Sequence, residues 1–479
     1  MSKLSRRRLL TAGAVIPFSQ WMAGQAWART PLVRRDYTTA AAATDLGRYA
    51  AAVKQMMAAA ESDTRGWMFQ WYIHAVRNDR TKAGEISRVY PVPSPQRTLA
   101  QASWSTCQAH SAGTVEDYFL PWHRMYVFFL EAIMRNLIGQ PTFALPYWRY
   151  TQPAERALAS QFRMSGDPTW GALYRSSRNP GTNAGTAIDN GLSPTPLNTD
   201  SLNQTTYSPS GGQPGFCAQI DGNLHGSVHV LTGNSVGMGS VPWAANDPVF
   251  WMHHCNIDRM WASWNRNGGC NPSDSSWLSH TFTFPDANGN SVVATIKDFK
   301  AIGPLNYSYD TFEPGPIIGT CNRIIFNLDW LRHLYLYPLP WPIDPAGPVE
   351  IRLKEPPRTL AAPNPKQLIS PKNARPRLIL EGLTATAPPE TLFEVFLKGA
   401  GGKPQHLGYI NFFDAVPMKH DEGEMAGMKM APPVKFFSFD AGAALRGVKG
   451  APTIGIRPVG KGGNREAKLS IGQVRLVMG

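Results

Sequence analysis

Histidine is the residue type with the clearest chemical pattern in this chain. Seven of the 11 histidines fall between residues 74 and 254, namely His74, His110, His123, His225, His229, His253 and His254. His225 and His229 are four residues apart, so on a helix they project from one face at a spacing that suits metal chelation. The chain has no Cys-x-x-Cys pair, which argues against structural zinc. Imidazole ligands suit copper, zinc, iron or nickel, and spacing alone does not choose among them.

Helices must bring these histidines together, and the apolar periodicity predicts several. The predicted helices cover residues 45–60, 66–77, 121–138, 225–231 and 248–265. A stretch rich in Ser, Asn, Gly and Pro at 160–215 predicts long loops. We therefore expect a mainly α catalytic domain over residues 29–337.

The pattern changes after this domain. Nine prolines between Pro338 and Pro365 predict a linker over residues 338–365. Short β-type runs then alternate with Gly and Pro turns, at residues 377–380, 392–397, 409–413, 435–439, 453–457 and 469–477. Such spacing predicts a C-terminal all-β sandwich domain over residues 366–479.

The first 28 residues are typical of an export signal. The pair Arg6-Arg7 precedes an apolar stretch, and Ala26-Trp27-Ala28 fits a small-x-small cleavage pattern. Residues 1–28 are thus expected to be a twin-arginine signal peptide that directs the chain to the periplasm or the medium. This route carries folded proteins, which suits a chain that must acquire a cofactor before export.

Charge and hydropathy exclude other classes of protein. The formal net charge is +13, and it falls to +9 without the four basic residues of the leader. The remaining charge is spread along the chain, so no nucleic-acid partner is expected. No later apolar run approaches the ~20 residues needed to span a bilayer, so no stable membrane insertion is expected. A homo-oligomer is compatible with the sequence.

Two longer motifs surround the central histidines. Residues 119–127, Phe-Leu-Pro-Trp-His-Arg-Met-Tyr-Val, and residues 247–261, which contain His253-His254 and Asp258, resemble the two copper signatures of the type-3 copper family. This family comprises tyrosinases, catechol oxidases and haemocyanins, and the resemblance covers about residues 60–335. Tyr307-x-Tyr309 also resembles the tyrosine motif of plant and fungal polyphenol oxidases, for which Arg34-Arg35 is a candidate partner.

The resemblance implies a four-helix-bundle site that holds two copper ions per chain, with O2 as co-substrate. The first copper would be bound by His74, His110 and His123, and the second by His225, His229 and His254. Either His253 or His254 could take the last position, but the family places the ligand four residues before the aspartate, which selects His254. His253 is then expected on another helical face.

Neighbouring groups are expected to tune the site. Asp258 and Glu131 are candidates for holding the imidazole rings, or they form ordinary helix ion pairs. The resemblance also makes a thioether between Cys107 and His110 a candidate modification, although the Cys-x-x-His spacing differs from the Cys-x-His arrangement of many relatives.

The expected substrates are small phenols. The resemblance implies oxidation of o-diphenols to o-quinones and ortho-hydroxylation of monophenols. Asp221 is the candidate for holding a water or acting as a base, but Gly226 lacks the amide that would help it. Val241 matches a gate position above the first copper, and Val230 is expected to line the substrate pocket. The alternatives are a catechol or o-aminophenol oxidase without efficient monophenol hydroxylation, and an O2-binding protein similar to haemocyanin.

The C-terminal domain contains a Met-rich stretch at residues 418–430. Its thioethers and imidazole are candidates for a Cu(I) site, since Cu(I) prefers soft ligands, and they are Met418, His420, Met425, Met428 and Met430. The same stretch could instead cover the active site, or be a loop without function.

Overall fold

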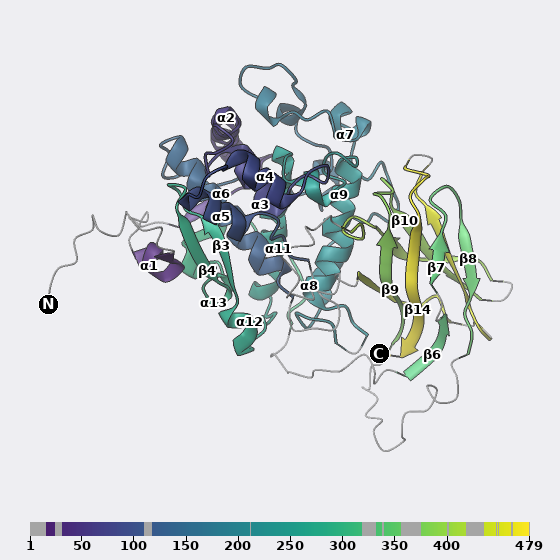
Figure 1. Cartoon of the computed structure of the whole chain (residues 1–479). Coiled ribbons are helices and arrows are strands. Elements are labelled where there is room, and N and C mark those ends of the chain that lie inside the picture. The colour runs from purple at the N-terminus through teal and green to yellow at the C-terminus, as the bar shows by residue number, and fades with distance from the viewer. Residues whose placement is uncertain are drawn as a thin grey trace.

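The helix-rich and β-rich parts of the chain lie side by side (Figure 1). The computed structural model describes residues 16–23, 31–109, 117–210, 212–318, 332–337, 340–355, 375–399, 402–417, 435–446, 448, 450–460 and 463–478. Helices dominate up to residue 318, and β-strands dominate from residue 332 onward. The predicted fold class, a mainly α domain followed by an all-β domain, is confirmed.

Two long helices form the centre of the helical domain. They are α6 (Phe119–Leu137) and α11 (Pro248–Arg266), and almost every residue of both is buried. The first turn of α11 is well specified, because Pro248 occupies a position where no N–H is needed and the Asp247 carboxylate accepts a hydrogen bond from the Val249 N–H at 2.9 Å. Against them pack α2 (Ala43–Ala58) and α3 (Trp67–His74).

The remaining helices are shorter. They are α1 (Phe18–Ala23), α4 (Lys82–Val89), α5 (Pro95–Ser103), α7 (Pro180–Ala184), α8 (Gly215–Gln219), α9 (Gly226–Thr232), α10 (Val241–Ala244), α12 (Ser275–Ser279) and α13 (Ile296–Phe299). A π-helical turn, Ile220–His225, leads directly into α9. The predicted helix at 225–231 therefore begins earlier than expected. The helix predicted at 66–77 ends at His74 because Ala75 is extended.

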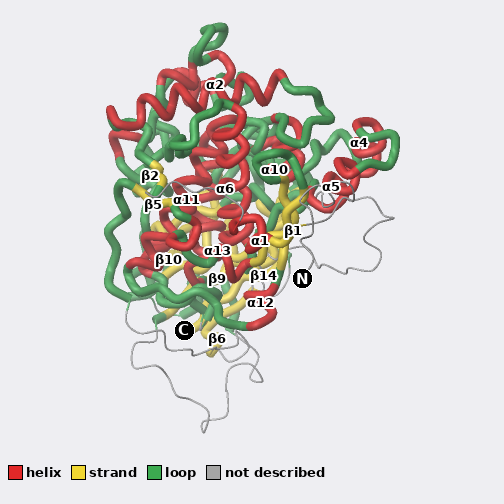
Figure 2. The backbone as a smooth tube through the Cα atoms, turned by 90° about the vertical axis from the view of Figure 1, so that its left-hand side faces the viewer, coloured by secondary structure: helices red, strands yellow, loops and turns green. Residues whose placement is uncertain are grey.

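Small sheets support the helical domain, and the sequence patterns did not predict them. Strand β4 (Ser291–Thr295) pairs antiparallel with β3 (Thr281–Pro285) and parallel with β1 (Ile16–Pro17). Strand β2 (Leu32–Arg34) pairs parallel with β5 (Tyr307–Tyr309). Figure 2 shows β2 and β5 together at one side of α6 and α11, and β1 at the other.

The C-terminal domain contains two sheets. One has the order β11-β10-β13-β8, and the other has the order β12-β9-β14-β6, with β7 also paired to β14. The strands are β6 (Arg332–Tyr337), β7 (Trp341–Ile343), β8 (Val349–Arg352), β9 (Pro376–Ala385), β10 (Phe393–Lys398), β11 (Gln405–Ile410), β12 (Phe436–Asp440), β13 (Thr453–Pro458) and β14 (Leu469–Met478). Their inner faces share an apolar core of their own.

The predicted linker at 338–365 requires correction. β7 and β8 lie inside that range, and β6 lies inside the range predicted for the catalytic domain. Trp341 and Ile343 are buried and pair with β14, while Pro342 between them is exposed, as proline in an outer strand position can be. The β domain therefore begins before the proline-rich stretch and continues into it with β7 and β8.

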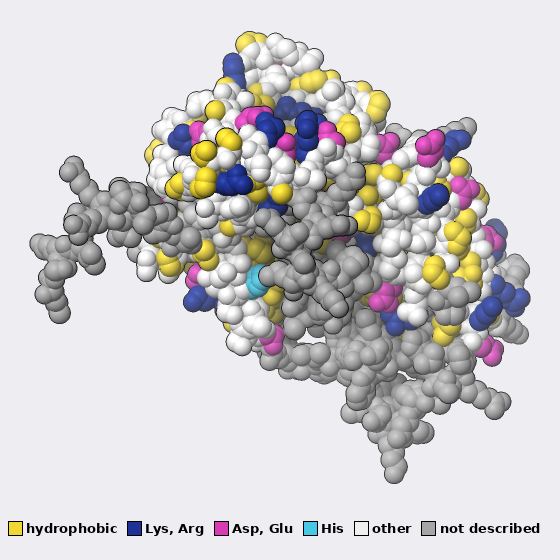
Figure 3. Space-filling model, in the orientation of Figure 1, with side chains coloured by type: hydrophobic (Ala, Val, Ile, Leu, Met, Phe, Trp, Pro, Cys, Tyr) yellow, Lys and Arg dark blue, Asp and Glu magenta, His cyan; other side chains and the backbone are white. Residues whose placement is uncertain are grey.

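The two domains share an apolar interface. Ala218 of α8 forms a small buried cluster with Ile379, Phe436 and Val477 of the β domain. The Ser438 hydroxyl adds a hydrogen bond to the Gly212 carbonyl at 2.6 Å. Within the described ranges, no helix is long and apolar enough to cross a membrane. On the face shown in Figure 3, Lys and Arg side chains are interspersed with acidic ones over both domains.

Candidate metal centre

Four helical segments bring the predicted histidines to one place. His74 ends α3, His123 lies in the first turns of α6, His225 and His229 belong to the π-turn and α9, and His254 belongs to α11. All five side chains are buried. The ring centroids of His123 and His254 are 4.2 Å apart and nearly parallel, and those of His225 and His229 are 4.5 Å apart. The rings thus form one compact group.

The outer nitrogen of each of four rings faces an acceptor. The Nδ1 atoms of His74, His123 and His229 lie 3.0, 2.7 and 2.8 Å from the carbonyl oxygens of Val241, Phe119 and Met238, respectively. The Nδ1 of His225 lies 2.8 Å from a carboxylate oxygen of Asp221. A proton on Nδ1 leaves the Nε2 lone pair free, which is the arrangement that ligating imidazoles show.

Burial also favours the neutral form of four of the rings. It lowers the pKa of His74 to about 3, and it holds the pKa values of His123, His229 and His254 well below their ordinary range. The Nε2 atoms of His225 and His229 are only 3.0 Å apart, so a shared metal ion is a natural partner for both. Neutral imidazoles bind divalent and monovalent metals through this lone pair.

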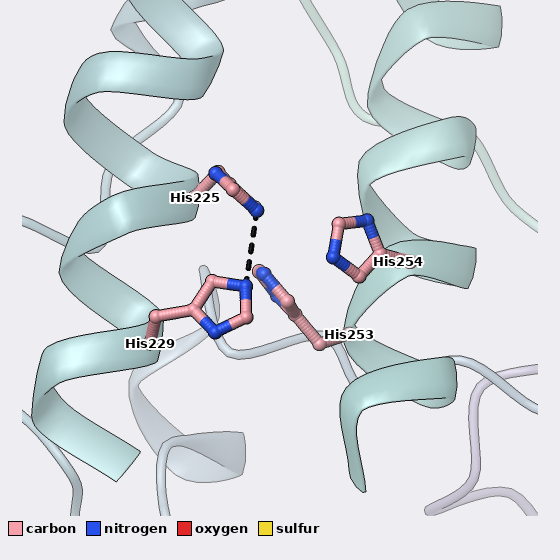
Figure 4. Close-up of side chains that lie close together, drawn as sticks. All are labelled: His225, His229, His253 and His254. Carbon is pink, nitrogen blue, oxygen red and sulfur yellow. Dashed lines mark hydrogen bonds between the residues drawn. The ribbon is translucent and has the colours of Figure 1, made fainter. Parts of the chain in front are cut away.

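His253 lies closer to this group than the sequence predicted. Figure 4 shows His253 and His254 of α11 facing His225 and His229, with all four rings directed into the space between the helices. The His253 ring is nearly parallel to that of His225, with centroids 5.3 Å apart, so it lies among these rings although consecutive helix positions project in different directions. The Tyr150 hydroxyl lies 2.9 Å from its Nδ1. The metal-binding atoms of these four histidines all lie within 4.8 Å of one another.

His254 differs from His253 in its contacts. Both ring nitrogens of His254 are buried without a hydrogen-bond partner, whereas His253 leaves only Nε2 without one. His254 also lies against His123 at 4.2 Å, so it connects the two histidine groups. A metal ion bound through one of these nitrogens would offset the cost of burying that atom without a partner. These residues therefore fit a metal centre.

Only two of the three histidines predicted to bind the first copper are among the described residues. His74, Cys107 and His123 form a second group of potential ligands within 4.8 Å. The Cys107 Sγ lies 3.7 Å from the Nε2 of His123, and the thiol is free. His110 lies outside the described residues, so the thioether prediction stays a prediction.

Asp221 and Gly226 have contacts that the sequence did not predict. Asp221 is buried, and its carboxylate faces the outer nitrogen of His225 rather than the centre of the group. A Cβ atom on Gly226 would lie 2.5 Å from the Oδ1 of Asn411, a residue of the β domain. Gly226 thus leaves the space that the Asn411 side chain fills. Asn411 is fully buried and donates to the Gly222 carbonyl at 2.7 Å.

The two valines predicted at the gate and in the substrate pocket both lie next to a histidine of the buried group. Val241 begins α10, is half-buried, and offers its carbonyl to His74. Val230 follows His229 in α9 and is buried. The Met-rich stretch, with Met418, His420, Met425, Met428 and Met430, lies outside the described residues.

Phe413 of the β domain is a site residue that the sequence analysis missed. Its ring stacks on His229 with centroids 4.0 Å apart, and it meets His225 edge-on at 5.7 Å. Phe413 follows β11, whose apolar alternation predicted a strand continuing through this residue. The turn after Ile410 redirects the ring toward the histidines, and no local sequence signal marks that change.

Asp258 and Glu131 do not hold the imidazoles in any described contact. Asp258 instead accepts hydrogen bonds from Arg34, Tyr307 and Tyr309 at 3.1, 2.6 and 2.5 Å. Glu131 accepts one from Arg34 at 2.9 Å. Burial alone would raise the pKa of Asp258, but Arg124 and Arg34 outweigh it and hold this pKa below its ordinary value. The two acids therefore form a buried ion-pair network, the other expectation from the sequence.

Comparison with known proteins agrees with this geometry. The family model "Common central domain of tyrosinase" matches residues 64–209 and 177–267. Tyrosinase HcTyr1 of Hahella sp. is 32% identical over 299 residues, which are 56% of this chain and 61% of that protein. Polyphenol oxidase A1 of Vicia faba is 31% identical over 267 residues, which are 48% of this chain and 44% of that protein. In each case the match spans less than two thirds of the relative.

Solved structures share the fold across nearly the whole chain. Latent apple tyrosinase superposes with a TM-score of 0.61 at 20% identity, covering 97% of this chain and 99% of that one. A functional unit of octopus haemocyanin has a TM-score of 0.51 at 15% identity, covering 91% and 99%. Residues 64–267 of this chain match the central domain that tyrosinases share, and the chain has the fold of latent apple tyrosinase.

Proposed function

We propose that this protein is a copper-dependent oxidase that uses O2 to convert o-diphenols to o-quinones. The observation that carries the proposal is the set of buried, neutral imidazoles whose outer nitrogens face fixed acceptors and whose inner nitrogens converge. Two bound coppers would supply electron exchange between the phenol and O2. Six neutral imidazole ligands suit both copper oxidation states, because they add no negative charge.

Each residue has a distinct part in this proposal. His74, His110 and His123 hold the first copper, and His225, His229 and His254 hold the second. The Asp221 carboxylate, 2.8 Å from the outer nitrogen of His225, orients that ring through its charge. Tyr150 positions His253 beside the second copper. Val230 lines the path of the substrate ring.

Hydroxylation of monophenols is the second activity that we infer. Val241 supports it, because a small side chain at the start of α10 leaves space beside His74. Asp221 and Gly226 argue for slow hydroxylation of monophenols. One carboxylate oxygen of Asp221 already lies 2.8 Å from His225, and Gly226 has no side-chain amide that could hold a water. We therefore propose that diphenol oxidation outpaces monophenol hydroxylation.

We also propose that the β domain limits access to the metal centre. Phe413 lies directly on His229, and Asn411 occupies the space beside Gly226. A phenol ring that approached the second copper from this side would have to displace Phe413. Partial withdrawal of the β domain should therefore raise activity toward bulky diphenols more than toward small ones.

Copper quantification beside oxygen-uptake assays tests the function. A copper-loaded full-length chain is expected to hold two equivalents and to consume O2 with 4-methylcatechol faster than with p-cresol. The zinc-loaded chain is the control and should consume none. Binding of O2 without turnover of any diphenol would favour the haemocyanin-like alternative. Turnover of o-aminophenol but not of catechol would favour the aminophenol oxidase.

Export by the twin-arginine route remains a proposal from the leader sequence. Fusion of residues 1–28 to a reporter tests it, with Arg6→Lys/Arg7→Lys as the matched variant. Export of the reporter that does not respond to the double substitution would contradict the proposal.

A further inference from the structure

Residues 16–23, inside the predicted leader, are part of the folded helical domain. We call them the leader segment. Its strand β1 pairs parallel with β4, with Ile16 opposite Val292 and Pro17 opposite Val293. The helix α1 follows immediately and lies against β4 (Figure 1). The leader segment thus extends a sheet of the domain and then packs beside it.

The apolar side of α1 is buried in an aromatic groove. This groove is formed by Phe128 and Phe129 of α6 and by Phe299 of α13. The Phe18 ring lies 4.5 Å from the Phe299 ring and about equally far, at 5.9 and 6.0 Å, from the rings of Phe128 and Phe129. The Trp21 ring lies 5.8 Å from that of Phe129. Phe18 and Trp21 are only 4% and 6% exposed.

Polar contacts fix the orientation of the leader segment. The Trp21 indole N–H donates to the Oδ2 of Asp286 at 3.2 Å. The other oxygen of Asp286 accepts the N–H groups of Asn288 and Asn290, so this carboxylate is held in place by its own turn. Ser19 and Gln20, between the two aromatic residues, are exposed. The groove therefore recognises an aromatic pair at a spacing of three residues.

We propose that the aromatic groove is a binding site for the chain's own leader segment, through which the folded catalytic domain holds its leader. Without the leader segment, the aromatic groove and the edge of β4 would both be exposed to solvent. Exposed apolar surface beside an unpaired strand edge favours association with another segment. Once the domain has folded, the Phe18 and Trp21 side chains are covered, so presentation of the leader segment to an export machinery depends on its release from the groove. This proposal is independent of phenol oxidation.

The test uses the full-length chain with a site-specific protease site inserted between Ala28 and Arg29. After cleavage, the fragment ahead of the cut is expected to remain bound at one copy per chain in native mass spectrometry and in gel filtration. The Phe18→Ser/Trp21→Ser variant is expected to lose the fragment on cleavage. The matched control is Gln20→Ser, which changes an exposed residue of the same helix and should retain the fragment.

Amide exchange gives a second measurement, made on the cleaved Phe18→Ser/Trp21→Ser chain beside the cleaved unsubstituted chain. Loss of the fragment should speed amide exchange in β4 by about tenfold or more, because β1, one of its two strand partners, is gone. Immediate release of the unsubstituted fragment, with unchanged exchange in residues 291–295, would overturn the proposal. So would equal retention by the Phe18→Ser/Trp21→Ser variant, since retention would then not depend on the aromatic groove.

Discussion

The Phe413 ring lies on the His229 imidazole, with centroids 4.0 Å apart and planes inclined by 14°. The two residues are separated by more than 180 positions and belong to different domains. The Nδ1 of His229 also lies 2.8 Å from the carbonyl oxygen of Met238. A ligand of the proposed second copper is therefore fixed on one side by its own domain and covered on another by the β domain.

Phe413→Ala should raise diphenol oxidation by the full-length chain. Removal of the ring opens the side of His229 that Phe413 covers, and we expect kcat/KM to rise by about tenfold or more, because a larger fraction of molecules can admit substrate. Phe396→Ala is the matched control, since Phe396 lies in β10 of the same domain and contacts His406 and Arg457 instead. Equal rates for both variants would contradict the covering role.

His254→Ala and His253→Ala should separate a metal ligand from its neighbour. His254 connects the two histidine groups and has two unpartnered buried nitrogens, so its loss should reduce copper from two equivalents to about one and abolish turnover. His253→Ala should retain both coppers and show slower turnover. Copper analysis of the purified variants decides between the two, and the reverse pattern would assign the ligand to His253.

Alanine should have opposite effects at two helical glycines. At Gly226, the new Cβ would collide with Asn411, so we expect a loss of roughly 1–3 kcal/mol in the free energy of unfolding. At Gly47 of α2, no atom lies within 4 Å of the added Cβ, so a gain of roughly 0.5–1 kcal/mol is expected. Thermal unfolding measures both. If both substitutions raised the free energy of unfolding, the Asn411 side chain would have moved aside to admit the new Cβ atom.

The position of Asn411 beside Gly226 also affects a test of whether a side-chain amide at position 226 helps to hold a water. Gly226→Asn should raise the ratio of monophenol to diphenol turnover, but only where Asn411 leaves room for the new side chain. The substitution therefore belongs in an Asn411→Ala background, compared with Asn411→Ala alone. An unchanged ratio between the two would mean that the amide has no part in monophenol hydroxylation.

Glu313 should contribute to stability above its unfolded pKa and lose that contribution in acid. Burial alone would raise its pKa, but hydrogen bonds and charge from Arg149 and Arg259 lower it from 4.5 to about 2. The unfolded chain then binds the proton first, so stability falls between pH about 4.5 and about 2, by about 3 kcal/mol in total. Unfolding of the native chain and Glu313→Gln across this range should show the loss only in the native chain. Glu466→Gln, at an exposed position, is the control.

The sequence predicted the helical centre well, because long apolar periodicity and proline at a helix start are local signals. The helices at 121–138 and 248–265 agree with α6 and α11 to within two residues at each end. The linker at 338–365 was misplaced, since proline density hides the short strands β7 and β8. Their pairing partners, β14 and β13, lie more than 100 residues later in the chain. Such pairing has no local signature.

The histidine positions could be predicted by type and spacing, but their surroundings could not. Carbonyl acceptors such as Met238 and Val241 carry no sequence signal, because any residue offers the same group. Asn411 and Phe413 reach the histidines through the packing of two domains. The contact between His253 and His225 depends on how α11 is rotated about its axis, which a one-dimensional pattern does not fix.

The pairing of β2 with β5 has a consequence for how the helical domain comes apart. Arg34, near the start of the domain, and Tyr309, near its end, meet at Asp258 in the centre of α11. Fraying at either end would therefore disturb the same buried cluster, because loss of Arg34 removes a charged partner of Asp258 and loss of Tyr309 removes a hydrogen-bond donor to it. The two ends and the helices that carry the buried histidines should open together, as one cooperative unit.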